Sequence, residues 1–193
     1  MSIGKNIFES VNKSYSSFSR GYYSSIKKTV VFLSHKSEDK NYVEKIGEYL
    51  MNAGVDIYLD KYDPNLQCAT YEGNAKKVTE CIQKGIDNSD YILCITSKAT
   101  INSWWVPYEI GYGKNAKKQI STLIRKDVTY IPDYLQIEPV MKDISELNFF
   151  IKKITKNYGI PLNESYTINK SESTGQIQYA SSSHPLSSYL NVR

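Results

Sequence analysis

The residues best suited to chemistry lie in the aromatic segment 103–113, SWWVPYEIGYG. At helical spacing Glu109 shares a face with Trp105 and Tyr112, while an apolar side that includes Val106 faces a sheet. A carboxylate among aromatic rings at the edge of a core is unusual, because acids are rarely buried without a partner. The helix alone leaves two interpretations open for Glu109, a surface acid beside core aromatics or the acid of a site.

Composition narrows the class of protein. The chain has 193 residues, of which 40% are hydrophobic and 23% charged, which suits one globular domain with tails. The net charge of +4 comes from lysines spread along the chain, so we do not expect nucleic-acid binding. No stretch approaches the roughly 20 apolar residues of a membrane span, and the N-terminus lacks the apolar core of a signal peptide.

Cysteine and histidine usage points away from a metal site. Cys68, Cys81 and Cys94 match no metal or redox spacing, and Cys94 lies in an apolar run that suggests a buried thiol. His35 and His184 are far apart and have no ligand at metal-binding spacing, so no metal is expected. Unpaired cysteines suit a reducing compartment, and we expect a cytoplasmic protein.

Strand-like and helix-like segments alternate along the chain. Apolar runs at residues 29–34, 55–60, 91–96 and 119–125 predict buried strands, and an edge strand is expected within 126–144. Helical periodicity occurs at 43–50, 75–86, 105–113 and 147–154, and Asp-Pro-Asn at 63–65 suggests a turn in a long loop between 61 and 73. This alternation predicts an α/β fold, an open parallel five-stranded sheet of order 2-1-3-4-5 with helices on both faces.

Three regions are expected. Residues 1–27 form an N-terminal arm with apolar residues near helical spacing, which would pack on the domain or on a partner subunit, or lie on a membrane surface. Residues 28–160 form the domain. Residues 161–193 are polar and Ser-rich, which predicts a flexible C-terminal tail.

The predicted sheet order indicates where a site should lie. Ligands of open parallel sheets bind beyond the carboxyl ends of the strands, where the order reverses. Ser34 and His35 follow the first strand, Asp60 ends the second, Ser97 follows the third, and the helix of Glu109 comes next. A P-loop is missing, and no nucleophile elbow supports a catalytic triad built from His35. Gly111-Tyr112-Gly113 follows no strand and is interpreted as a close helix–sheet contact.

The chain resembles a TIR (Toll/interleukin-1 receptor) domain over about residues 28–157. The resemblance is carried by VVFLSHKSEDK at 30–40, VDIYLDKYD at 55–63, YILCITSKA at 91–99 and SWWVPYEIGYG, which contains a W-x-x-x-E pattern at Trp105 and Glu109. The short single-domain form is similar to bacterial TIR proteins of anti-phage, Thoeris-like defence systems. This resemblance implies a flavodoxin-like fold.

The resemblance also implies an activity, the cleavage of NAD+ as an NAD+ glycohydrolase or ADP-ribosyl cyclase. NAD+ would be the substrate, so no cofactor is implied. Glu109 would be catalytic and Trp105 would line the site, while loop position assigns four further residues to substrate binding: Ser34, His35, Asp60 and Ser97.

The implied biological role is signalling. The product would be a cyclic or conjugated ADP-ribose, sensed by a separate effector protein, and the TIR surfaces would self-associate. Two alternatives stay open: a TIR interaction module that scaffolds partners without catalysis, and a nucleoside-processing transferase on a similar sheet.

Overall fold

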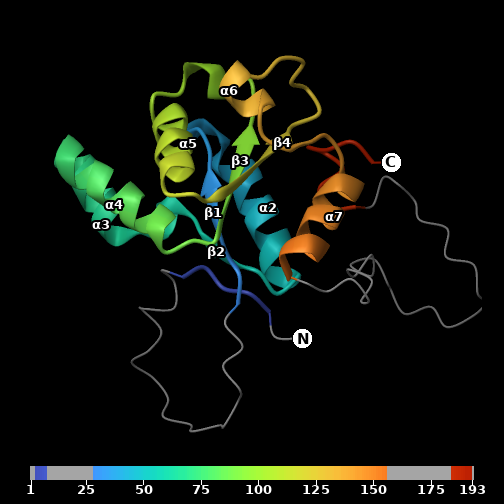
Figure 1. Cartoon of the computed structure of the whole chain (residues 1–193), viewed down its shortest axis with the longest axis horizontal. Coiled ribbons are helices and arrows are strands. Elements are labelled where there is room, and N and C mark those ends of the chain that lie inside the picture. Colours follow the sequence, from blue (N-terminus) through green and yellow to red (C-terminus); the bar gives the residue numbers. More distant parts are fainter. Residues whose placement is uncertain (1–2, 8–27, 156–183, 193) are drawn as a thin grey trace, which may run out of the picture.

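A five-stranded parallel sheet forms the centre of the computed structural model, which describes residues 3–7, 28–155 and 184–192 (Figure 1). The strand order is β2-β1-β3-β4-β5, so the predicted order 2-1-3-4-5 is confirmed. The strands are β1 Val30–Ser34, β2 Asp56–Tyr58, β3 Tyr91–Thr96, β4 Gln119–Ile124 and β5 Val140–Met141. The apolar runs form the central strands because both of their faces are buried.

Helices cover both faces of the sheet (Figure 1). They are α2 Lys40–Asn52, α3 Pro64–Tyr71, α4 Ala75–Asp87, α5 Trp105–Asn115, α6 Asp133–Gln136 and α7 Ile144–Thr155. One apolar core joins the sheet to α2 and α7, and a second joins it to α3, α4, α5 and α6. The two cores therefore place α5, which carries Glu109, on the same side as α3 and α4.

The expected long loop after β2 contains a helix, and this part of the sequence interpretation was wrong. Asp63 is the N-cap of α3, since its carboxylate accepts hydrogen bonds from the backbone N–H groups of Asn65 (3.0 Å) and Leu66 (3.3 Å). Pro64 occupies the first helical position, where a missing N–H costs nothing. The Asp-Pro-Asn sequence that suggested a turn is thus a helix start.

The described part of the N-terminal arm is extended. Asn6 forms a parallel bridge with Ile57 of β2, and the N–H of Ile57 donates to the carbonyl of Lys5 at 2.9 Å. The segment 3–7 thereby covers the free edge of β2, an effective protection against pairing with other chains. Helical spacing was the expectation for the arm, and its residues 8–27 lie outside the described part of the chain.

Residues 184–192 pack against the domain, although a polar tail was expected there. Leu186 and Leu190 are buried in the core that contains α2 and α7. The ring of Tyr189 stacks on that of Tyr42 in α2, with 4.7 Å between centroids. Burial of these two leucines anchors the short segment. The remainder of the expected tail, up to residue 183, is not described.

Gly113 provides the close helix–sheet contact that the sequence suggested. A Cβ atom at this position would come within 2.1 Å of Ile92 Cδ1 on β3. Ile92 is fully buried, so its side chain could make room only by displacing neighbouring side chains of a close-packed core.

We expect Gly113→Ala to lower the free energy of unfolding by about 1–3 kcal/mol, because the added methyl overpacks the core. Urea denaturation measures this change. Gly111→Ala is the matched control, since a Cβ there meets nothing within 4 Å. It should leave stability unchanged or raise it by about 0.5–1 kcal/mol through helix propensity. Equal effects of the two substitutions would contradict the close contact.

The described residues include no helix with the length and hydropathy needed to cross a membrane.

Candidate active site

Glu109 lies on α5 and faces the carboxyl end of β1. Glu109 is only 8% exposed. The hydroxyl of Ser34, the last residue of β1, donates a hydrogen bond to Glu109 Oε2 at 2.6 Å. The side chains of a strand alternate between faces, so Ser34 points to the α5 side together with Phe32. The contact joins two of the residues that the sequence placed in a site.

Burial changes the acidity of Glu109. Loss of hydration raises the pKa of its carboxyl group from 4.5 to about 8. The hydrogen bond from Ser34 acts in the opposite direction, and the nearby carboxylate of Asp60 raises the pKa further. Burial therefore favours the protonated form of Glu109, and a cation placed beside it would favour the ionised form.

Two residues that sequence reasoning left out of the site lie close to Glu109. Cys94 of β3 is the register partner of Ser34, and burial and then Glu109 raise the pKa of its thiol. Burial raises the pKa of Tyr134 on α6 to about 12, with smaller contributions from Cys94 and Glu109. Cys94 was expected to be buried, and it is, but its proximity to Glu109 depends on strand register, which the sequence does not encode locally.

His35 and Asp60 face each other next to Ser34 and Glu109. His35 Nε2 lies 3.5 Å from Asp60 Oδ1, and neither atom has a hydrogen-bond partner among the described residues. The other ring nitrogen, Nδ1, lies 2.9 Å from the carbonyl oxygen of Leu33 and carries the hydrogen, because a carbonyl can only accept. The Asp60 side chain is 32% exposed, so part of its carboxylate reaches the surface while His35 adjoins the rest.

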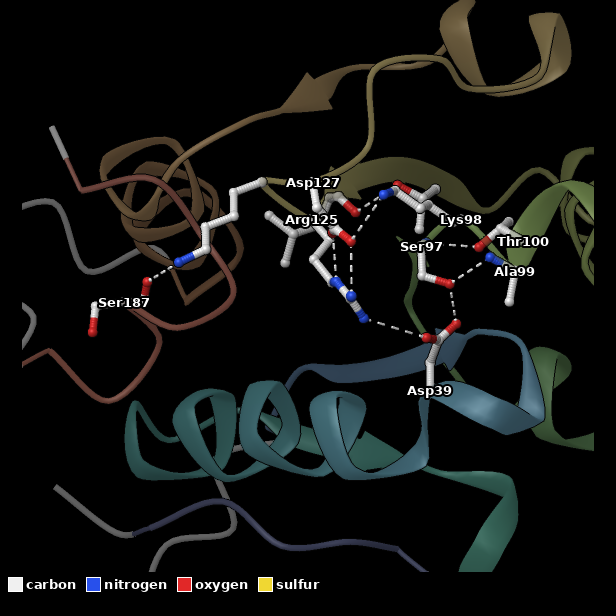
Figure 2. Close-up of polar contacts among 11 residues, drawn as sticks. Asp39, Ser97, Lys98, Ala99, Thr100, Arg125, Asp127 and Ser187 are labelled. Atoms are coloured by element: carbon white, nitrogen blue, oxygen red, sulfur yellow. Dashed lines mark hydrogen bonds and ion pairs between the residues drawn. The ribbon is translucent and has the colours of Figure 1, made fainter.

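Ser97 belongs to a separate polar network (Figure 2). Its hydroxyl donates to Asp39, which follows β1 in the short 3-10 helix Ser37–Asp39, and accepts from the N–H of Ala99 at 3.0 Å. Arg125 lies 3.8 Å from Asp39 and makes a bidentate contact with Asp127, at 2.6 and 2.8 Å. The hydroxyl of Ser97 thus connects the loops after β1 and β3, and Arg125 extends the network to the loop after β4.

Trp105 stands at the start of α5 with 41% of its surface exposed. Its ring packs edge-on against Tyr108, 6.0 Å between centroids, and Tyr108 stacks on Tyr112 at 6.3 Å. Among the described residues these ring contacts connect Trp105 to the other aromatics of α5 and not to Glu109. Trp105 offers an accessible ring face at the helix start.

Within the described part of the chain, no group of three or more His, Cys, Asp or Glu side chains is placed to hold a metal ion.

Comparison with known proteins gives a family match. A profile described as the TIR domain matches residues 31–155, which is well over half of the chain. A comparison with curated proteins finds no significant match.

Several solved structures are similar at low identity. The TIR domain of the Toll-related receptor TRR-2 from Hydra magnipapillata is 17% identical, with a TM-score of 0.47 over 65% of this chain and 90% of that domain. The SEFIR domain of the IL-17 receptor B is 11% identical, with a TM-score of 0.48 over 66% of this chain and 95% of that domain. The CMP N-glycosidase BcmB from Clostridium botulinum is 20% identical, with a TM-score of 0.38 over 58% of this chain and 85% of that enzyme. Similarities at these identities and TM-scores do not indicate an activity.

Proposed function

The chain belongs to the TIR domain family, and we propose that it is an enzyme that cleaves NAD+ between nicotinamide and ribose. The observation that carries the proposal is the buried carboxyl group of Glu109, held by Ser34 at the carboxyl end of the inner strand β1. Its raised pKa and its position at the end of a parallel sheet are typical of functional acids.

A single carboxylate is sufficient for this reaction. Ordinary glycosides need an acid to protonate the leaving oxygen, which is why glycosidases usually carry two carboxyl groups. Nicotinamide in NAD+ is already cationic and leaves as a neutral base when the bond between its nitrogen and ribose C1′ breaks. The remaining task is to stabilise a cationic, oxocarbenium-like ribose, and an ionised Glu109 in a poorly hydrated site can do this.

The neighbouring residues support the same reaction in distinct roles. Ser34 holds the Glu109 carboxyl group and favours its ionised form. Asp60 adds a second acceptor for ribose hydroxyls, and His35 lies beside one of its carboxylate oxygens. Trp105 provides a ring for stacking of nicotinamide or adenine. We assign Ser97 an indirect part, because its hydroxyl fixes the loop after β3 through Asp39.

The proposed product is an ADP-ribose derivative, cyclic or conjugated, made when adenine or another nucleophile in place of water attacks ribose C1′. A separate effector protein would sense it in a cytoplasmic anti-phage response. Self-association through TIR surfaces would complete or open the site, since Glu109 is only 8% exposed and NAD+ must displace the side chains that cover it.

Incubation of the purified chain with NAD+, followed by chromatography with mass identification, tests the proposal. We expect release of nicotinamide together with an ADP-ribose derivative. The assay should cover dilute and concentrated protein, because an assembled site would give a specific activity that rises with concentration. Intact NAD+ at every concentration, with protein shown to be folded, would contradict the proposal.

A non-catalytic interaction module is the second candidate, and exposed apolar residues favour it. Trp104 is 90% exposed and Ile101 is 54% exposed in the loop before α5. Large apolar side chains grouped on a surface often mark protein contacts. Sedimentation of wild type and Trp104→Ser, together with the nicotinamide assay on wild type, separates the two candidates. The scaffold is favoured if Trp104→Ser assembles more weakly than wild type and if wild type releases no nicotinamide.

A further inference from the structure

A cavity of about 500 Å³ lies next to the carboxyl ends of β4 and β5, a volume within the usual range for small-molecule sites. Its walls come from the loop after β4, from α6, from β5 and from the C-terminal segment, which contributes Asn191. Residue 191 lies beyond the part of the chain that matches the TIR family, so one wall of the cavity is an addition to that domain. We propose that this cavity binds a nucleoside phosphate.

The charges around the cavity favour an anion. Arg125, Lys126 and Lys142 line it, and no carboxylate side chain is among the lining residues. The guanidinium of Arg125 is paired with Asp127 and Asp39, so Lys126 and Lys142 are the lining cations that remain for an anionic ligand.

The two lysines have hydrogen-bonding capacity left for a ligand. The ammonium group of Lys126 donates to the backbone carbonyl of Ser187 at 2.9 Å, which uses one of its three N–H bonds. The ammonium group of Lys142 makes no hydrogen bond or ion pair with other described residues. A phosphate group would gain charge-assisted hydrogen bonds from both.

The rest of the lining suits a planar base. Four aliphatic side chains, Ile124, Val128, Ile131 and Val140, supply an apolar surface. The ring of Tyr130 lines the same cavity and is 57% exposed, so one face can receive a stacked base. The amide nitrogen of Gln136 is used by the carbonyl of Ile131 at 2.9 Å, and its amide oxygen can accept from an exocyclic amino group.

This cavity differs from the Glu109 site. Its lining includes none of Ser34, His35, Asp60 or Glu109. The side chain of Arg125, which lines the cavity, lies 3.8 Å from Asp39, and Asp39 accepts a hydrogen bond from Ser97 (Figure 2). Nucleoside phosphate binding here therefore does not require that the chain cleave NAD+, and the nicotinamide assay tests that activity separately.

Calorimetric titration of the full chain with ADP, adenosine and inorganic pyrophosphate tests the proposal. We expect ADP to bind more tightly than either fragment. Lys142→Glu should weaken ADP binding by about 10-fold or more, because it replaces a charge-assisted contact by repulsion. Lys84→Glu on α4 is the control, since it makes the same change of net charge at an exposed position away from the cavity. Amide NMR shifts should change in residues 124–142 and 184–192.

Three results would overturn the proposal. The first is the absence of ADP binding to the wild-type chain. The second is an equal loss of affinity in Lys142→Glu and Lys84→Glu, which would mean a general charge effect. The third is a set of ADP-induced shifts confined to the neighbourhood of Ser34 and Glu109. Pyrophosphate binding as tight as ADP binding would overturn the assignment of the apolar wall to a base.

Discussion

Replacement of Glu109 by Gln should lower the rate of nicotinamide release by about 100-fold or more while the fold is retained. Glutamine has nearly the same shape and can still accept the hydrogen bond that Ser34 donates at 2.6 Å. It cannot carry the negative charge that stabilises the cationic ribose in the transition state, and losses of this size are typical for such electrostatic groups. The measurement is kcat/KM for nicotinamide release by each purified protein.

Glu80→Gln is the matched control for this experiment. Glu80 lies on α4, its side chain is 59% exposed, and it undergoes the same chemical change. Its activity should equal that of wild type. If Glu109→Gln is folded and releases nicotinamide at the wild-type rate, then Glu109 is not the catalytic carboxylate and the proposed mechanism fails.

The activity should depend on pH through Glu109, and Ser34→Ala should move this dependence to higher pH. For NAD+ cleavage by the ionised carboxylate, kcat/KM should rise with pH up to about 8, the pKa of Glu109 in the free protein. The Ser34 hydroxyl stabilises the charged form, so its removal raises the pKa. The rising limb of the profile then shifts in the alkaline direction.

Two comparisons make this prediction specific. The rising limb for kcat should lie at lower pH than that for kcat/KM, because the bound nicotinamide cation favours ionised Glu109. Ser121→Ala on β4 is a control for a buried serine, and its profile should match that of wild type. Identical profiles for Ser34→Ala and wild type would show that Ser34 does not control the ionisation of the catalytic group.

The same pKa predicts a change in stability that needs no enzyme assay. The carboxyl group titrates near 4.5 in the unfolded chain and near 8 in the folded protein, so the folded protein binds more protons between these values. The free energy of unfolding should therefore fall by a few kcal/mol as pH rises through this window. Glu109→Gln removes this contribution, and urea denaturation at several pH values compares the two proteins.

Local patterns in the sequence were sufficient for most of the secondary structure. Apolar runs predicted the four longer strands, because a strand buried on both faces favours apolar residues at most of its positions. Gly54 follows α2 with a φ of +87°, a conformation that glycine adopts readily just after a helix. The W-x-x-x-E segment also located Glu109 on the helix after β3. These features depend on residues close together in the chain.

Other features depend on contacts between residues distant in the chain, and local sequence patterns predicted these features wrongly or not at all. The turn expected at Asp63 proved to be the N-cap of α3, where Tyr58 also donates to the second carboxylate oxygen of Asp63 at 2.9 Å. Leu190 is buried in the core although its surroundings in the chain are polar. A few apolar residues suffice to anchor a segment when the rest of the domain supplies the partner surface.

The sequence by itself determined which residue types were present for chemistry and which strand each followed. The tertiary structure decided their relations. It brings Ser34 and Glu109, 75 residues apart, to 2.6 Å, sets Cys94 beside them through strand register, and turns the hydroxyl of Ser97 to Asp39. The acidity of Glu109 follows from the same packing, because burial is a property of the whole fold and not of any short stretch of chain.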